Sequence, residues 1–303
     1  MHPLSVPGVL DVKVVRGLGA VADAPIDLLI EIPHGATTTQ DYEAIAAQLE
    51  SPLPAGLIDF FRVNTDIGAP ELAFAFADRV VELDPTLTVM ILRARVPRTF
   101  LDFNRRIDAS AAEFKAGGVG PGLMPWVITG ADKALLFSLY GTWVRAVEAA
   151  CDHLAADGLM LLLHTYAPRT VGVSVDADIV PSLHAAYEPD IFETWPLRPE
   201  LDLIARGEDG ERVIPDALFE AITRRFAPLG IAPGDSATYR LHPATLGHRW
   251  VQRFPGRVLC PEFRRDLLTD AFEPFSPANI SDEKVAPLAG ALAAAVVDFR
   301  GSR

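Results

Sequence analysis

The chain has few of the residues that build disulfide frameworks, and it has no long hydrophobic run. Its 303 residues include only two cysteines, Cys151 and Cys260, which do not make a disulfide framework. No apolar stretch approaches the ~20 residues that a membrane helix needs. The first residues carry two early prolines and no basic residue before Lys13, which does not make a signal peptide. We therefore expect a reduced, soluble, cytoplasmic protein that is not bound to a membrane.

Basic residues are also scarce relative to acidic ones. The chain has 27 Lys and Arg against 40 Asp and Glu, which gives a net charge of −13 and a pI near 4.9. This charge repels phosphate backbones, so we expect no nucleic-acid partner. Half of the residues are hydrophobic and 22% are charged, which excludes a disordered chain. The 25 prolines and 22 glycines indicate many short connections, as in an enzyme whose site is built from loops.

Segments typical of strands alternate with segments typical of helices along the whole chain. Strands are expected at 25–32, 87–94, 158–163 and 256–263, and helices at 68–83, 131–156 (as one helix or two), 214–226 and 281–299. This alternation favours an α/β fold with three layers, in which helices cover both faces of a mostly parallel mixed sheet. We expect long loops at 108–124 and 168–212. Since there is no internal repeat or linker, residues 1–303 are expected to form a single domain.

Polar side chains follow the expected strands at the points where the strands end. They are His34 after the first strand, Arg98, Asp102, Asn104 and Arg105 after the second, His164 after the third and Glu262 on the last. Ligands of open α/β sheets bind beyond the carboxyl ends of the strands. Each residue alone has a structural explanation, because a histidine after a strand is often only a hydrogen-bonding group of a loop. The group as a whole indicates a ligand site.

These residues belong to short motifs that resemble a known family. The motifs are Ile32-Pro-His-Gly35, Thr65-Asp66, Arg98-Thr-Phe-Leu-Asp-Phe-Asn-Arg105, His164-Thr-Tyr166 and Pro261-Glu-Phe-Arg-Arg-Asp266. In this order they resemble the N-formylglutamate amidohydrolase family, over roughly residues 25 to 300. The Arg-x-x-x-Asp-x-Asn-Arg spacing is the most specific of them. Through this family the chain is also similar to the zinc carboxypeptidase and aspartoacylase group.

The resemblance implies one zinc ion per chain, held by His34 and His164. Zinc accepts imidazole and carboxylate ligands, and its catalytic sites keep one position open for water. The carboxypeptidase relatives place a glutamate three residues after the first histidine, where this chain has Thr37. The third ligand must therefore lie elsewhere. Asp66 is our choice, with Asp41 and Glu43 as alternatives.

The resemblance also implies roles for the other residues of the group. Glu262 would be the general base, and Arg98 would polarise the scissile carbonyl and stabilise the oxyanion. Asn104 and Arg105 would hold a substrate carboxylate, for which a guanidinium offers a bidentate fork. Asp102 would orient the arginines. His242 or His248 would contact the substrate, although a plain loop role is an equal alternative.

The sequence departs from the family pattern at several positions. Gly35 is followed by Ala36, Leu162 stands where the family often has Asp, and Arg106 stands where it often has Pro. These changes bear on the substrate more than on the reaction. We therefore expect a zinc-dependent amidohydrolase of amino-acid catabolism that cleaves a small carboxylated acyl-amino acid such as N-formylglutamate. A deacylase or carboxypeptidase with another substrate, and a non-catalytic binder of small carboxylates, stay open, as does a homo-oligomer.

Overall fold

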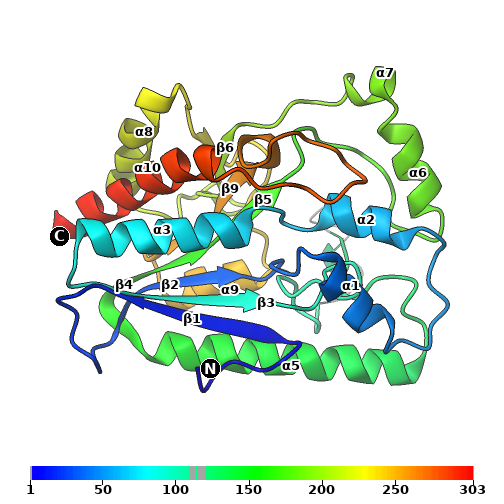
Figure 1. Ribbon diagram of the computed structural model, residues 1–303, viewed down its shortest axis with the longest axis horizontal. Helices are drawn as coiled ribbons and strands as arrows, with labels where there is room; N and C mark the ends of the chain where they lie inside the picture. The colour runs from blue at the N-terminus through cyan, green and yellow to red at the C-terminus, as the bar shows by residue number, and fades with distance from the viewer. Residues whose placement is uncertain (1, 110–112, 115–119, 303) are drawn as a thin grey trace.

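The computed structural model describes residues 2–109, 113–114 and 120–302 and contains two sheets (Figure 1). The larger sheet has five strands, in the order β1 (Leu10–Arg16), β3 (Thr88–Ala94), β2 (Ile26–Ile32), β4 (Leu154–Leu162) and β8 (Val258–Leu259). Its strands are parallel except for β1, which runs antiparallel to β3 at one edge. The expected mostly parallel mixed sheet is therefore confirmed.

Helices cover both faces of the larger sheet. One face packs against α3 (Ala69–Leu83), α8 (Asp216–Phe226) and α10 (Asp282–Gly301), and the other against α5 (Gly130–Asp152) and α9 (Leu246–Arg253). Figure 1 shows α3 and α10 on one side of the strands and α5 on the other. Successive residues of β2 belong to different cores, since Leu28 and Ile30 face α3 while Leu29 faces α5. The α/β/α arrangement is confirmed.

A smaller sheet continues beyond the carboxyl ends of two strands. Its order is β5 (His164–Tyr166), β9 (Pro261–Arg264), β6 (Leu201–Leu203) and β7 (Gly234–Asp235). The single strands expected at 158–163 and 256–263 are therefore wrong in extent. The first belongs to β4, which begins earlier and ends just before Leu163, where the chain breaks before β5; the second is divided into β8 and β9 at Cys260. The two breaks match, because Leu161 pairs with Leu259 before them and His164 pairs with Glu262 after them.

The remaining elements are mostly short. They are α1 (Thr39–Ala46), α2 (Leu57–Asn64), α6 (Ile179–Ala186), α7 (Pro189–Phe192) and two single turns of 3-10 helix, η1 (Ala227–Leu229) and η2 (Arg265–Leu267). The expectation of a loop at 168–212 is wrong, since α6, α7 and β6 lie within it. The expected loop at 108–124 falls partly outside the described residues.

Two long helices agree with the expectation from sequence more closely. The helix expected at 131–156 is one helix that ends at Asp152, because β4 begins at Leu154. The helix expected at 281–299 is α10, with Ser281 at its N-cap. Within the described ranges, no helix is both long enough and apolar enough to cross a membrane. The organisation as a single domain stays a prediction.

Candidate metal centre

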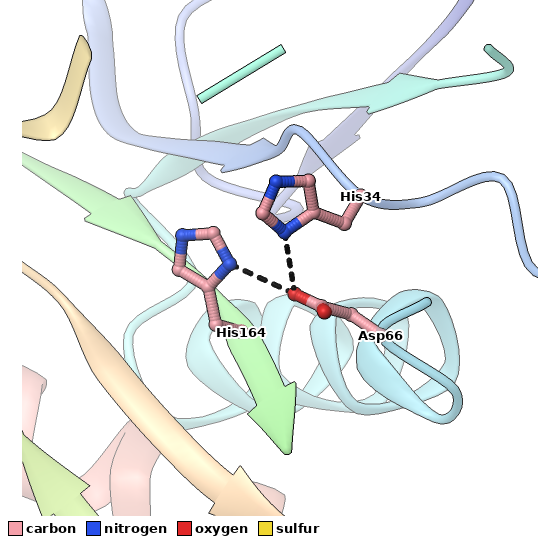
Figure 2. A group of neighbouring side chains, drawn as sticks. All are labelled: His34, Asp66 and His164. Atoms are coloured by element: carbon pink, nitrogen blue, oxygen red, sulfur yellow. Dashed lines mark hydrogen bonds and ion pairs between the residues drawn. The ribbon is translucent and has the colours of Figure 1, made fainter. Parts of the chain in front are cut away.

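Three buried side chains from distant segments meet at the junction of the two sheets. His34 follows β2, Asp66 lies between α2 and α3, and His164 is the first residue of β5. Figure 2 shows both imidazole rings directed at one carboxylate oxygen. The Nδ1 atoms of His34 and His164 lie 3.2 and 2.8 Å from Oδ2 of Asp66. One potential ligand atom from each residue lies within 4.8 Å of the others, so the three could hold a metal ion together.

The second nitrogen of each imidazole is also occupied. Nε2 of His34 lies 2.7 Å from Oδ1 of Asp102, and Nε2 of His164 lies 3.5 Å from Nδ2 of Asn104. The carboxylate contact of His34 is of the kind that orients metal-binding histidines, whereas Asn104 presents an N–H donor to His164. Here the two contacts leave both Nδ1 atoms facing Asp66. The contact between Asp102 and His34 was not foreseen from the sequence.

The charges around the two aspartates explain how they stay ionised inside the protein. Burial acts to raise the pKa of Asp66, but His34 and His164 outweigh it and hold this pKa well below its usual range. Burial likewise acts to raise the pKa of Asp102, and Arg105, Arg98 and His34 lower it well below its usual value. Two imidazoles and an ionised carboxylate are a donor set that zinc binds in proteins. The chemistry of the three residues therefore fits this ion.

Glu262 lies beside His164 on the neighbouring strand of the smaller sheet. The two residues are register partners in the parallel pairing of β5 with β9. Burial raises the pKa of Glu262 to about 7, and the negative charge of Asp66 adds to this effect. A carboxyl group that titrates near neutral pH can both accept and release a proton.

Most of the residues that the sequence singled out as a site line one cavity of about 830 Å³. They are His34, Asp66, Arg98, Asn104, Arg105, His164, His242 and Glu262. Arg98 donates to Oδ2 of Asp102 at 2.8 Å. The Arg105 Nη1 atom lies 3.7 Å from the same oxygen. The structure thus brings the set together, while the role of each member in binding or catalysis stays a prediction.

Asn104 and His242 also have polar partners within the protein. The amide oxygen of Asn104 accepts from the backbone N–H of Gly247 at 3.1 Å. Nδ1 of His242 accepts from the backbone N–H of Ala244 at 3.0 Å, and its Nε2 lies 3.1 Å from Glu208. Both side chains are therefore held in place before any substrate arrives.

The alternative third ligands lie elsewhere. Asp41 belongs to the capping box at the start of α1 and pairs with Arg95 at 2.6 Å. Glu43 is exposed on the same helix. Neither residue lines the cavity, and His248 does not line it either. Of the three candidate carboxylates, only Asp66 is placed to act with both histidines.

The cavity also contains residues that sequence reasoning missed. The Arg198 guanidinium lies 4.9 Å from the centre of the Tyr166 ring and 5.5 Å from that of Tyr239, and it donates to the Tyr239 hydroxyl at 2.7 Å. Arg265 is buried and donates to the Val63 carbonyl at 2.7 Å, and burial lowers its pKa to about 10. The sequence offered two signals for these residues. Tyr166 stands two positions after His164, and Arg265 belongs to the pair of arginines that follows Glu262. Arg198 had none, because its segment was expected to be a loop.

Comparison with known proteins identifies the fold. No family model and no curated protein matches the chain. Among solved structures, the N-formylglutamate amidohydrolase from Ralstonia eutropha JMP134 matches 96% of this chain and 97% of its own, with 16% identity and a TM-score of 0.57. The gene product Atu2144 from Agrobacterium tumefaciens matches 97% and 95%, with 16% identity and a TM-score of 0.56. A putative carboxypeptidase from Burkholderia mallei is less similar, with a TM-score of 0.41. Over nearly its whole length, the chain has the fold of the N-formylglutamate amidohydrolase structure.

Proposed function

We propose that this protein is a zinc-dependent hydrolase that cleaves the amide bond of a small N-acyl amino acid, such as N-formylglutamate. The products would be the free acid and the amino acid. The observation behind this proposal is that His34, Asp66 and His164 converge in one cavity with Glu262 beside them. The fold shared with the N-formylglutamate amidohydrolase from Ralstonia eutropha supports it.

The proposed chemistry divides between the metal and the side chains of the cavity. When bound, zinc supplies a Lewis acid that polarises the amide carbonyl and makes water more acidic. Glu262 takes a proton from the attacking water and delivers it to the leaving nitrogen, which cannot depart as an anion. Arg98, which Asp102 holds at 2.8 Å, stabilises the negative charge that develops on the carbonyl oxygen.

Recognition of the substrate carboxylate is assigned to Arg105. Its planar guanidinium can bind a carboxylate through two parallel hydrogen bonds. It lines the cavity, and its closest acidic neighbour, Asp102, is 3.7 Å away. Asn104 was expected to share this role. Because its amide already contacts Gly247 and His164, we propose that Asn104 mainly orients the second histidine.

The Glu262→Gln variant tests the proposal. Glutamine keeps the shape of the side chain but cannot accept the proton, and a general acid–base group typically contributes ~10²–10⁴-fold to the rate. We expect kcat for N-formylglutamate to fall by about this factor while the zinc content and the melting temperature stay unchanged. The control is Glu220→Gln on the exposed side of α8, which should leave all three quantities unchanged.

The same measurements separate an enzyme from a binding protein. If the wild-type protein binds zinc and small carboxylates but hydrolyses no acyl-amino acid, the chain is a binder and the proposed function is wrong. If Glu262→Gln keeps near-normal kcat with normal zinc content and stability, the assignment of Glu262 as the base is wrong.

A further inference from the structure

One wall of the cavity is apolar and lies on segments that the proposed chemistry does not use. It consists of Phe60, Val63, Val171, Val173, Val175 and Leu183, all of which line the cavity, and we call it the apolar lobe. Phe60, Val63 and Leu183 belong to the same hydrophobic core cluster, and Val173 packs against that cluster. The lobe therefore takes its residues from α2, α6 and the extended segment 171–175, all of which border the same cavity.

The segment 171–175 directs its valines into the cavity by a simple alternation. Val171, Val173 and Val175 line the cavity, whereas Gly172 and Ser174 between them do not. A side chain at Gly172 would lie 3.2 Å from the ring of Trp195, so this glycine allows the segment to lie flat against the indole. Trp195 is fixed in turn, because its Nε1 donates to the Ala186 carbonyl at 3.2 Å. The indole thus supports a segment whose Val171 and Val173 are partly buried at the cavity, whereas Val175, which also lines it, is 36% exposed.

The helices on the other side of the lobe are held against each other. Helix α2 packs on α6, and Figure 1 shows the two helices next to each other. At the start of α2, the left-handed Gly56 (φ 73°) lies against Val180 of α6. Phe60 also contacts Trp126 edge-on, with ring centres 5.5 Å apart. Phe60, Val63 and Leu183 of the apolar lobe therefore lie on two helices that pack against each other.

The cavity is larger than an N-formyl amino acid alone would fill. A volume of about 830 Å³ lies in the range of pockets that enclose drug-sized ligands. The charged groups of the proposed site, such as Arg98, Arg105 and Glu262, come from other segments. An apolar surface that faces a binding cavity gains free energy only when an apolar group covers it.

We infer that the substrate carries a bulky apolar group next to the scissile amide, and that this group binds in the apolar lobe. The inference rests on the proposed function and makes it more specific. The apolar group could be a long acyl chain or the side chain of the amino acid. Either group would present an apolar surface to the lobe, and the experiment below distinguishes the two.

Two substrate series measured with the zinc-loaded protein test the inference. The first varies the acyl group (formyl, butanoyl and octanoyl glutamate), and the second varies the amino acid (formyl-glutamate, formyl-leucine and formyl-phenylalanine). Only the series that extends the group bound in the apolar lobe should respond. Along that series we expect kcat/KM to rise by roughly fourfold for each methylene, or equivalent apolar carbon, that is buried. If N-formylglutamate is hydrolysed and is the best substrate of both series, the inference is wrong while the proposed function stands.

Substitutions in the segment 171–175 supply a second measurement. Val173→Asp places a carboxylate in the lobe and should reduce the preference for the apolar substrate over N-formylglutamate at least tenfold. Val173→Thr, which nearly keeps the shape, should reduce it less. The matched control is Ser174→Asp, whose side chain does not line the cavity and should leave the preference unchanged.

Direct binding keeps the inference testable if nothing is hydrolysed. In that case the proposed function fails, and the affinity for octanoyl-glutamate and formyl-phenylalanine is measured by calorimetry. Tight binding that Val173→Asp weakens and Ser174→Asp does not would support the lobe. Equal affinity of all three proteins for both compounds would overturn it.

Discussion

At the scale of single residues, Asp102 connects the two halves of the candidate site. One of its carboxylate oxygens contacts His34 at 2.7 Å and accepts from the Asn104 backbone N–H at 2.8 Å. The other contacts Arg98 at 2.8 Å. A single buried carboxylate therefore orients a proposed metal ligand and a proposed oxyanion-stabilising group. It acts through its neighbours and is a positioning residue.

We predict that Asp102→Asn lowers the affinity for zinc. Asparagine keeps one oxygen but loses the charge that balances Arg98, and residues that orient metal ligands typically contribute ~10–100-fold to metal affinity. Competition with a zinc-binding dye measures this loss, and a thermal melt verifies that the variant is folded. Asp108→Asn is the control, because Asp108 is exposed and pairs with Arg106. Unchanged zinc affinity in folded Asp102→Asn would show that Asp102 does not orient His34.

At the scale of elements, strand β2 contains an acidic residue in a fully buried position. Leu28, Leu29, Ile30 and Ile32 have no exposed surface, and Glu31 is only 1% exposed. Its carboxyl lies near the indole N–H groups of Trp250 and Trp143, but neither reaches it with hydrogen-bond geometry. Burial raises the pKa of Glu31 to about 8. The carboxyl is therefore mostly neutral in the folded protein at neutral pH.

This pKa predicts how stability depends on pH. The unfolded chain ionises Glu31 near the ordinary glutamate pKa of 4.5, while the folded chain holds the proton up to about pH 8. The contribution of Glu31 to stability is thus complete below the unfolded value and is lost as pH rises through the folded one. Relative to wild type, Glu31→Gln should gain stability between about pH 5 and about pH 9, by on the order of a few kcal/mol.

Urea denaturation at these two pH values measures the difference, with Glu220→Gln as the exposed control. Glu262 also titrates, with a pKa of about 7, but it is present in both proteins, so its contribution largely cancels in the comparison. A difference between Glu31→Gln and wild type that does not change with pH would contradict the prediction.

The same scale shows which elements a sequence can predict. The long helices α3, α5 and α10 and the apolar strands have periodic patterns that determine them locally. The short helices α1, α2, α6 and α7 do not, because helices of eight residues or fewer depend on packing such as that of α2 on α6. The division of β4 from β5 was also invisible. The apolar run continues through Leu163, and only the three-dimensional pairing ends there.

At the scale of the whole molecule, the candidate site was largely predictable because parallel strands deliver their ends to one edge. His34, His164 and Glu262 could be placed near one another without knowledge of the strand order. The strand order explains why the three residues meet. Strand β4 lies between β2 and β8, so the segments that follow these strands lie next to each other. Arg198 and Tyr239 could not be predicted. They reach the cavity from segments with no periodic pattern, and only tertiary packing places them there.

The wide separation of the three proposed metal ligands along the chain has a kinetic consequence. His34 and Asp66 are 32 residues apart, and Asp66 and His164 are 98 apart, so an unfolded chain must close large loops to bring them together. A metal ion would therefore meet a complete set of these ligands only after the long-range topology has formed. We predict that a chelator speeds unfolding but leaves the refolding rate unchanged. Stopped-flow fluorescence of the four tryptophans measures both rates, and slower refolding in chelator would mean that the site forms before the rate-limiting step.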